Sequence, residues 1–379
     1  MNAMNSGLTQ RRKEVRELGF RAVTIFLVVI GVLGTGELLL RFEQHRRMGK
    51  NVYEPPNLFR YDAELGWALT PNWQGTHRQR EFQVQYTIDE LGFRADAQQV
   101  SGRSGKRHVF VGDSFTFGLG VNDSETFVHI LNGGGETNTY LNCAVPGFST
   151  DQELLLVERD ILNLRPDVVD LVVYLGNDLF DNELPVPLQA ARAKPYAELG
   201  PTGLVFKNIP VPLTTSSIAE ARMNLARVVL GDDYCRNSVR WRLENTSAVL
   251  QLLGEKVFPV RMKREELDAR FARPRELFFA IVERTRKASE DKGATLNLIL
   301  LPGRSFVEEP RTISAQFQDC LREQIVNEAR KLGYKVIDLA SALRVAHQES
   351  HGKYFFPNDG HLNPDGHRIV AQMLAHQLR

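Results

Sequence analysis

Residues 22–40 form the most strongly apolar stretch of the chain, and Glu37 is its only charged residue. At a rise of about 1.5 Å per residue, a helix over this stretch spans roughly 28 Å, which is close to the thickness of a bilayer core. The preceding segment, 1–21, is polar and carries five basic residues. The pattern therefore predicts a transmembrane helix over 22–40 that follows an N-terminal tail over 1–21.

The residues around this stretch favour an uncleaved anchor. No small-residue cleavage site stands out after it, whereas a removable signal peptide needs one. Glu37 lies four residues before Arg41, so we expect a local ion pair at the membrane interface. The basic residues on the two sides slightly favour a cytoplasmic tail, which places the main domain in the periplasm or another extracytoplasmic space. A cleaved segment or a buried amphipathic helix is the alternative.

Segment 41–106 is predicted to be a linker followed by a small β-rich appendage. Apolar and polar residues alternate over 82–88, as in a strand with one buried face. A turn is expected over 89–94, and the polar, glycine-containing stretch 101–107 is typical of a connector.

From residue 107 onward, short apolar runs alternate with longer amphipathic stretches, which is typical of a parallel sheet covered by helices on both faces. The predicted strands are 108–112, 140–144, 168–175, 295–301 and 335–339, and the main predicted helices are 151–163, 265–291 and 313–332. A proline-rich insertion over 184–261, with a helix-like stretch over 235–253, interrupts this rhythm. We expect it to be a lid or substrate-binding element, or else an insertion with a structural role only.

Composition narrows the classes of partner and cofactor. The chain has 379 residues, of which 25% are charged, as in ordinary globular proteins. Its net charge of +1 gives no electrostatic reason to expect a nucleic-acid partner. The three cysteines, Cys143, Cys235 and Cys320, lack the spacing of a zinc site or a redox pair, although a Cys235–Cys320 disulfide stays open for an exported domain. We expect no cofactor.

Four groups of polar residues follow predicted strands, at the edge where ligands bind in open α/β sheets. Each group has a plain structural alternative, such as a helix cap or a turn. That all four coincide on one edge, with complementary chemistry, favours a shared site. The groups are Gly112–Ser114, Asn142–Gly147, Tyr174–Asp178 and Asn358–His361.

Together these groups supply the parts of an acyl-transfer site. Ser114 is the candidate nucleophile, and a serine hydroxyl needs an adjacent base. His361 can take its proton, because an imidazole titrates near neutrality, and Asp359 can orient the ring. The candidate oxyanion hole consists of the backbone N–H groups of Ser114 and Gly147 and the side-chain amide of Asn177. Losing one such donor typically costs about 2.7–4 kcal/mol of barrier.

The order and approximate spacing of these blocks resemble those of the SGNH, or GDSL-type, hydrolase family, over 107–379 outside the insertion. The resemblance implies a flavodoxin-like three-layer α/β/α sandwich with a parallel sheet. It also implies the same roles: Ser114 as nucleophile, Gly147 and Asn177 as oxyanion donors, and Asp359 with His361 as acid and base.

Two positions depart from the family pattern. Phe115 stands where a leucine usually follows the serine. Asp359 lies two residues before His361 instead of the usual three, a spacing that resembles the branch of O-acetyl esterases and acetyltransferases acting on bacterial exopolysaccharides. A second histidine, His367, is a rival base that we expect to pack at the start of the last helix.

The resulting hypothesis is a membrane-anchored serine esterase that removes a small acyl group, most simply acetyl, from a carbohydrate through an acyl-enzyme. The alternatives are an O-acyltransferase on a polysaccharide with the same triad, a lipase acting on lipid, and a non-catalytic polysaccharide-assembly protein. Asp178 and Asp181 are expected to be solvated loop acids and no metal site is expected. Arg94 and Arg304 are candidate contacts for an anionic substrate.

Overall fold

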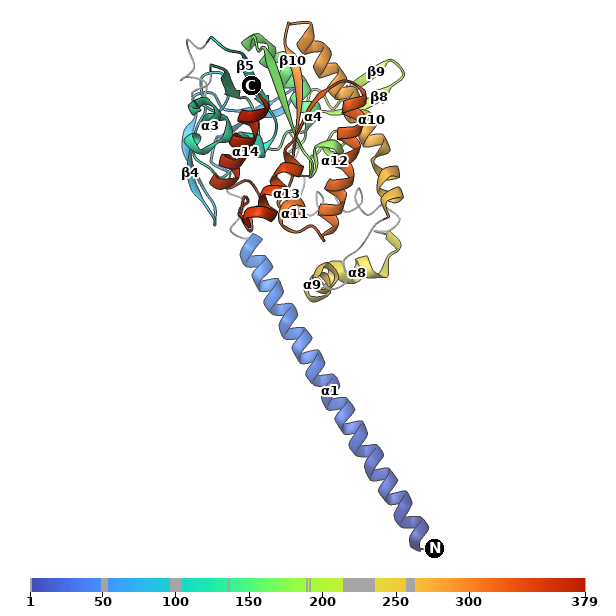
Figure 1. Cartoon of the computed structure of the whole chain (residues 1–379). Coiled ribbons are helices and arrows are strands. Elements are labelled where there is room, and N and C mark those ends of the chain that lie inside the picture. The colour runs from blue at the N-terminus through green and yellow to red at the C-terminus, as the bar shows by residue number, and fades with distance from the viewer. Residues whose placement is uncertain are drawn as a thin grey trace. The chain divides into compact units, whose positions relative to one another are not determined.

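The computed structural model describes residues 2–48, 54–95, 104–134, 137–188, 190, 192–213, 236–256 and 263–378. The chain divides into two compact units (Figure 1). The first combines 1–52 with 237–259, and the second combines 53–236 with 260–379. Part of the insertion therefore clusters with the N-terminal helix, and the rest of the described insertion belongs to the α/β unit.

The first unit contains the helices α1 (Asn2–Met48), α8 (Val239–Thr246) and α9 (Ala248–Lys256). Within α1, the stretch Arg16–Glu43 is long and apolar enough to cross a membrane, and none of its apolar window is buried. This confirms the predicted apolar helix, a feature that a membrane anchor and a signal sequence share. The expected pair between Glu37 and Arg41 is also present, at 2.6 Å.

The second unit is built on a five-stranded parallel sheet with the order β6–β5–β7–β10–β11. Counted along the chain this order is 2-1-3-4-5, that of flavodoxin-like folds, so the predicted fold class is confirmed. The strands are β5 (Arg107–Val111), β6 (Thr139–Asn142), β7 (Val168–Tyr174), β10 (Thr295–Leu301) and β11 (Lys335–Asp338). Central strands such as β7 are buried on both faces, which explains why their sequences are continuously apolar.

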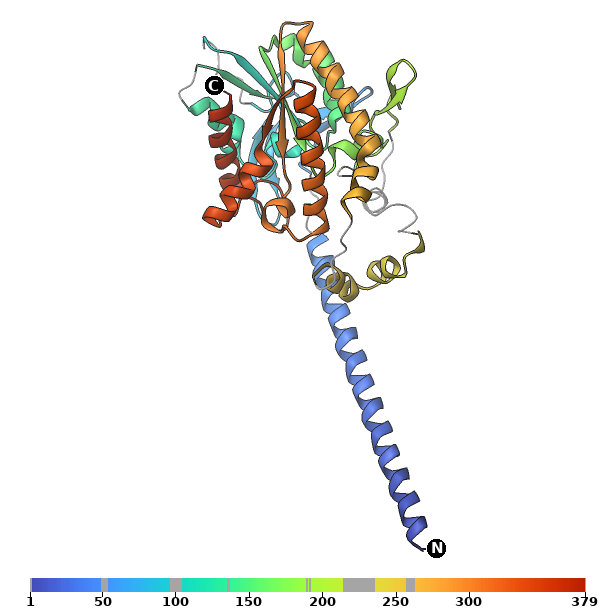
Figure 2. The same cartoon turned by 45° about the vertical axis from the view of Figure 1, so that its right-hand side comes forward.

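Helices cover both faces of this sheet (Figure 2). Within one group, α14 packs against both α3 and α13, and within the other α10 packs against both α4 and α12. The first group is α3 (Phe127–Gly133), α13 (Leu339–Ser350) and α14 (Pro364–Gln377), and the second is α4 (Thr150–Arg159), α10 (Arg264–Glu290) and α12 (Ile313–Lys331). The predicted helix over 151–163 ends early, because a 3₁₀ turn, Ile161–Leu164, replaces its last residues.

Three antiparallel hairpins complete the second unit, and short helical turns lie in its loops. The hairpins are β1 (Phe59–Asp62) with β2 (Gly66–Leu69), β3 (Gln74–Arg78) with β4 (Gln83–Thr87), and β8 (Tyr196–Gly200) with β9 (Gly203–Lys207). The turns are α2 (Ser114–Phe117), α5 (Asp178–Asp181), α11 (Arg304–Glu308) and the 3₁₀ turn Asp123–Glu125. Trp67 of β2 and Tyr86 of β4 are buried in the same core as the parallel sheet. The β-rich segment thus packs as part of the α/β unit.

Candidate active site

The serine lies in a sharp turn at the carboxyl end of β5. Asp113 caps the one-turn helix α2, and its Oδ1 accepts from the Phe115 N–H at 2.9 Å. Gly112 leaves no room for a side chain, because an added Cβ would lie 2.4 Å from Thr116 Oγ1. The turn therefore presents Ser114 at the sheet edge where ligands bind in this fold.

Ser114, His361 and Asp359 form one hydrogen-bonded chain. Ser114 Oγ lies 2.7 Å from His361 Nε2, although 247 positions separate the two residues. On the other side of the ring, His361 Nδ1 lies 2.5 Å from Asp359 Oδ1. If Nε2 accepts from the serine hydroxyl, Nδ1 carries the proton and donates to the carboxylate. Burial raises the pKa of Asp359, but the hydrogen bond and charge of His361 outweigh it and lower this pKa below its usual value.

Glu81, a residue that sequence reasoning missed, holds the loop that carries the acid. Its carboxylate accepts from the backbone N–H of Asp359 at 2.7 Å and from that of Asn358 at 2.9 Å. It also accepts from the Asn358 amide at 3.0 Å. Next to it, Phe82 packs on Phe356 of the same loop, with ring centroids 5.3 Å apart. The connection between β3 and β4 thus fixes the position of Asp359 through two main-chain bonds.

An aromatic stack supports the histidine ring. Phe115 lies against His361 with a centroid distance of 4.6 Å and against Tyr174 at 4.1 Å, nearly parallel to the tyrosine. The departure from leucine at position 115 therefore places a flat ring where it can contact the imidazole. The stack thus holds the imidazole ring in place beside Ser114.

The two other predicted oxyanion donors lie in the loops that follow the strands flanking β5. Gly147 follows β6 and has a positive φ of 82°, which favours glycine. Trp67 donates from Nε1 to the preceding carbonyl of Pro146 at 3.0 Å and so braces that loop. Asn177 follows β7, is 4% exposed, and donates from its side-chain nitrogen to Asp181. Since β5 lies between β6 and β7, the sheet order brings Ser114, Gly147 and Asn177 to adjacent loops.

Carboxyl groups are buried beneath this edge of the sheet, and the expectation that Asp178 and Asp181 are solvated is wrong. Burial raises the pKa of Asp181 to about 7, against the hydrogen bond from Asn177, and that of Asp113 to about 6. Burial, joined by the charge of Asp113, raises the pKa values of Glu153 and Asp178 well above their usual range. Both carboxyl oxygens of Glu153 are buried without a hydrogen-bond partner. In the described part of the chain, no three His, Cys, Asp or Glu side chains form a group suited to a metal ion.

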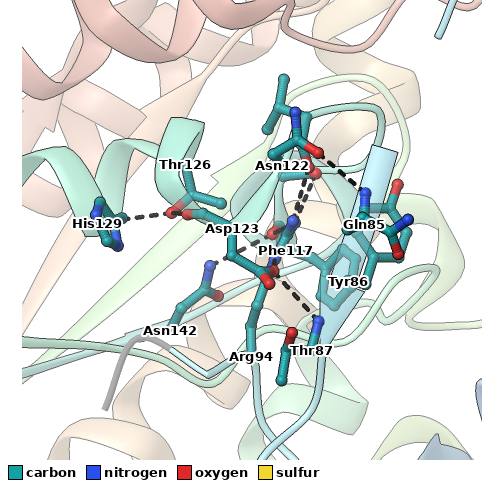
Figure 3. A network of polar contacts seen from close by, with 12 residues as sticks. Gln85, Tyr86, Thr87, Arg94, Phe117, Asn122, Asp123, Thr126, His129 and Asn142 are labelled. Atoms are coloured by element: carbon teal, nitrogen blue, oxygen red, sulfur yellow. Dashed lines mark hydrogen bonds and ion pairs between the residues drawn. The ribbon is translucent and has the colours of Figure 1, made fainter. Parts of the chain in front are cut away.

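Arg94 organises the loop that follows the serine, and Figure 3 shows it between β4 and that loop. Its guanidinium is fully buried and donates to the carbonyls of Phe117 and Gly118 at 2.7 Å and of Val121 at 2.6 Å. It also donates to Asp123 at 2.8 Å. The planar group is stacked on the Tyr86 and Phe117 rings as well. The suggestion that Arg94 contacts an anionic substrate is therefore wrong, since its donors bind the protein's own main chain.

Three other residues singled out in the sequence are held by contacts within the protein. His367 is 1% exposed, and its Nδ1 accepts from the Phe127 N–H at 3.2 Å. Burial lowers its pKa to about 3. His367 therefore packs in the core, as expected. Arg304 pairs with Glu309 at 3.1 Å. Cys320 is a buried free thiol whose Sγ donates to Asp268, which argues against the Cys235–Cys320 disulfide; Cys235 itself lies outside the described residues.

A separate hollow of about 760 Å³ lies at the opposite, amino-terminal edge of the sheet. Its lining includes Lys106, Asn297 and Tyr334. None of the four polar groups predicted from the sequence lies there, so this hollow is distinct from the candidate active site.

Comparisons with known proteins bear on the α/β unit. Solved structures that resemble the chain include an α/β hydrolase enzyme from the metagenome of Lake Arreo, with 14% identity over 73% of this chain and 95% of that one, at a TM-score of 0.37. A lipolytic protein of the G-D-S-L family from Veillonella parvula is 13% identical over 72% and 97% of the two chains, at a TM-score of 0.37. An acetylxylan esterase from Geobacillus stearothermophilus is 13% identical over 72% and 94%, at 0.36. No curated protein sequence matches the chain.

A family model supplies the more specific comparison. Residues 263–379 match the model described as the SGNH hydrolase-like domain of the acetyltransferase AlgX. The matched segment contains Asp359 and His361, and Ser114 lies before it. The segment 263–379 is thus similar to the SGNH hydrolase-like domain of an AlgX-type acetyltransferase, the hydrolase family that the four sequence blocks resemble.

Proposed function

We propose that this protein is a membrane-anchored serine esterase that removes an acetyl group from a carbohydrate. The observation that carries the proposal is the continuous hydrogen-bonded chain from Ser114 Oγ through both nitrogens of His361 to Asp359. Acyl transfer needs a nucleophile, a base and a group that orients the base, and this chain provides one of each.

In the proposed reaction, Ser114 Oγ attacks the ester carbonyl carbon while its proton moves to His361 Nε2. Asp359 stabilises the resulting imidazolium. The backbone N–H groups of Ser114 and Gly147 and the amide of Asn177 stabilise the negative oxygen of the tetrahedral intermediate. His361 then returns the proton to the departing sugar hydroxyl, which leaves an acetyl-enzyme. Water activated by the same histidine releases acetate and restores the serine.

The carbohydrate substrate is the finer part of the proposal. Its support is the two-residue spacing of Asp359 and His361 together with the match of 263–379 to an acetyltransferase domain. The same match favours a second candidate function, in which a sugar hydroxyl instead of water accepts the acetyl group. The two reactions share every step up to the acetyl-enzyme and differ only in the acceptor.

The membrane anchor is also part of the proposal. Its support is the apolar stretch Arg16–Glu43 of α1, whose side chains are exposed along the helix. We propose that α1 stays attached to the mature protein and that the α/β unit lies outside the cytoplasm. Protease treatment of intact spheroplasts should then digest the α/β unit, and its protection would contradict this topology.

The serine mechanism is tested by hydrolysis of p-nitrophenyl esters from acetate to palmitate, with the full chain in detergent micelles. Ser114→Ala should lower kcat/KM for the acetate by at least about 10³-fold, because it removes the nucleophile itself. Ser305→Ala, which removes a hydroxyl that donates to Ser314 and accepts from Gln318, is the matched control and should retain activity.

Three outcomes separate the hypotheses. Serine-dependent turnover of the short esters supports the esterase. Absence of turnover, combined with labelling of Ser114 by a fluorophosphonate, supports the transferase, which then needs a carbohydrate acceptor in the assay. Full activity in Ser114→Ala would contradict both.

A further inference from the structure

Glu37 is the only charged residue in the apolar stretch 22–40, and the structure assigns a partner to it. Its carboxylate accepts from the backbone N–H groups of Ala248 and Val249, both at 3.0 Å, and from the Ser247 hydroxyl at 2.7 Å. These donors are the beginning of α9, so the carboxylate caps that helix from outside. A negative charge in this position satisfies free N–H groups and is favoured by the helix dipole.

Two further contacts join α9 to the same end of the apolar stretch. Arg41, which pairs with Glu37, also donates to the Thr246 carbonyl at 2.6 Å. A Cβ added to Gly36 would lie 3.5 Å from a methyl group of Val249, which shows how closely the two helices approach. Both Figures 1 and 2 show α8 running across the direction of α1. A helix that crosses an anchor lies along a membrane surface when the anchor spans the bilayer.

Large apolar side chains of α8 and α9 stay exposed after this docking. Leu243 of α8 is 48% exposed, and Leu250, Leu252 and Leu253 of α9 are 38%, 42% and 39% exposed. On α1, the residues next to Glu37 are also apolar and exposed, with Leu38 at 71%. The leucines of the α8–α9 pair therefore continue the apolar surface of the proposed anchor at the point where the apolar stretch ends.

We propose that α8 and α9 form a membrane-surface helix pair that inserts these leucines into the lipid interface and is held to α1 by Glu37. The inference rests on α1 acting as an uncleaved anchor, as in the proposed function. A bilayer fits this surface because it covers apolar area around the whole circumference of α1, including the part next to α9. Helices of this kind lie with their apolar face in the boundary between headgroups and acyl chains.

The test places an environment-sensitive fluorophore on α9 of the full chain in nanodiscs. The background variant is Cys235→Ser, which leaves only the buried cysteines Cys143 and Cys320. Leu252→Cys carries the label on α9, and Leu38→Cys carries it on α1 as the reference for membrane contact. Lipids with a nitroxide near the headgroup report contact with the bilayer, and iodide reports contact with water.

The expected result is that nitroxide lipids quench both labels and that iodide quenches neither. Glu37→Gln should weaken the cap, because a neutral amide oxygen replaces the carboxylate, and should shift the label at position 252 toward iodide quenching. Glu37→Asp should retain more of the lipid contact. Far-ultraviolet circular dichroism of each variant checks that the helices still form.

Other outcomes overturn the inference in different ways. Iodide quenching at position 252, with lipid quenching kept at position 38, would support the anchor but contradict the proposed membrane contact of α8 and α9. Protection of position 252 from both quenchers would mean that protein, such as a second copy of the chain, covers the leucines. Loss of lipid quenching at position 38, or an intact mass that lacks 1–40, would instead overturn the anchor on which the inference rests.

Discussion

At the scale of single residues, the most informative contacts join side chains to main-chain groups of distant loops. Glu81 is the clearest case, because it accepts from the backbone N–H of Asp359 and of its neighbour Asn358. A carboxylate that accepts such bonds restricts the loop without contacting the substrate. Glu81 is therefore a positioning residue for the proposed triad.

Replacing this carboxylate should lower the rate of the chemical step. Charge-assisted hydrogen bonds contribute about 1.5–3 kcal/mol each, so we expect Glu81→Ala to lower kcat for p-nitrophenyl acetate by about 10- to 100-fold. KM should change little, since the Glu81 carboxylate binds the main chain of the Asp359 loop. Glu81→Gln keeps one acceptor oxygen and should recover part of the activity. The matched control is Glu90→Gln, an exposed glutamate on the turn after β4; an equal loss there would contradict the positioning role.

The buried carboxyl groups predict a dependence of stability on pH. The pKa values of Asp113, about 6, and of Asp181, about 7, lie above the value of about 3.9 for an unfolded chain. The folded state thus binds more protons, so the stability from these groups is complete below about pH 4 and is lost as the pH rises through about 6 to 7. We expect the free energy of unfolding to fall between pH 5 and pH 8.

Glu153→Gln should reduce that fall, because an amide has no proton to lose in this buried position. Burial and the charge of Asp113 raise the pKa of Glu153 well above its usual range, so the fall in the free energy of unfolding should be smaller in Glu153→Gln than in wild type. Urea unfolding at both pH values measures it. The exposed Glu265→Gln is the control, and identical pH profiles for Glu153→Gln and wild type would contradict the prediction.

At the scale of elements, the hairpin β3–β4 and the turn after it are part of the site's framework. Tyr86 of β4 accepts from the Gly120 N–H at 2.8 Å, and Arg94 binds the same loop through the carbonyls of Phe117, Gly118 and Val121. This loop begins at the end of α2, which carries Ser114. The β-rich segment therefore stabilises the nucleophile turn from one side and the Asp359 loop from the other.

Removing the guanidinium from this framework should destabilise the α/β unit. Arg94→Met leaves three carbonyls and the partly exposed Asp123 without their donor, and each buried polar group left without a partner costs about 1–3 kcal/mol. Arg94→Lys keeps the charge but loses the planar fork, so it should lie between Met and wild type. Urea unfolding of the full chain measures both variants. Arg60 is an exposed arginine on β1, and Arg60→Met should change stability little. A comparable loss of stability in Arg60→Met would contradict a specific stabilising role for the buried guanidinium of Arg94.

At the scale of the whole molecule, the chain consists of a helical unit with an apolar surface and an α/β unit that contains all three residues of the proposed triad. All the contacts described around Ser114, His361 and Asp359 lie in the second unit. The proposed chemistry and the proposed membrane anchor are thus assigned to different units, although the chain of the first unit interrupts that of the second at 237–259.

A chain that begins at residue 54 should test this division. Its kcat/KM for a soluble acetate ester should stay within about twofold of the full chain, because every contact described around Ser114, His361 and Asp359 lies within the α/β unit. It should also aggregate, since α9 has lost Glu37 and exposes its leucines. Replacing Leu250, Leu252 and Leu253 by Gln should reduce light scattering. A loss of activity above about tenfold in well-folded protein would contradict the division.

The sequence alone predicted the five strands of the parallel sheet, the helices α4, α10 and α12 and the four polar blocks, because these follow from local periodicity and from turns that need particular residues. It also located the apolar helix and the pairing of Glu37 with Arg41, which are local features of one helix. The resemblance carried by the blocks predicted the flavodoxin-like order of the sheet.

Only the tertiary structure decided which distant groups meet. Ser114 and His361 lie 247 positions apart, and Glu81 lies 277 positions before Asn358. The partner of Glu37 on α9 and the burial of Asp178, expected to be solvated, follow from chain packing in the same way. Periodicity reports whether a position faces the core of its own element, but the identity of its contact depends on how elements pack. For that reason the supporting residues of this site became apparent only in the folded protein.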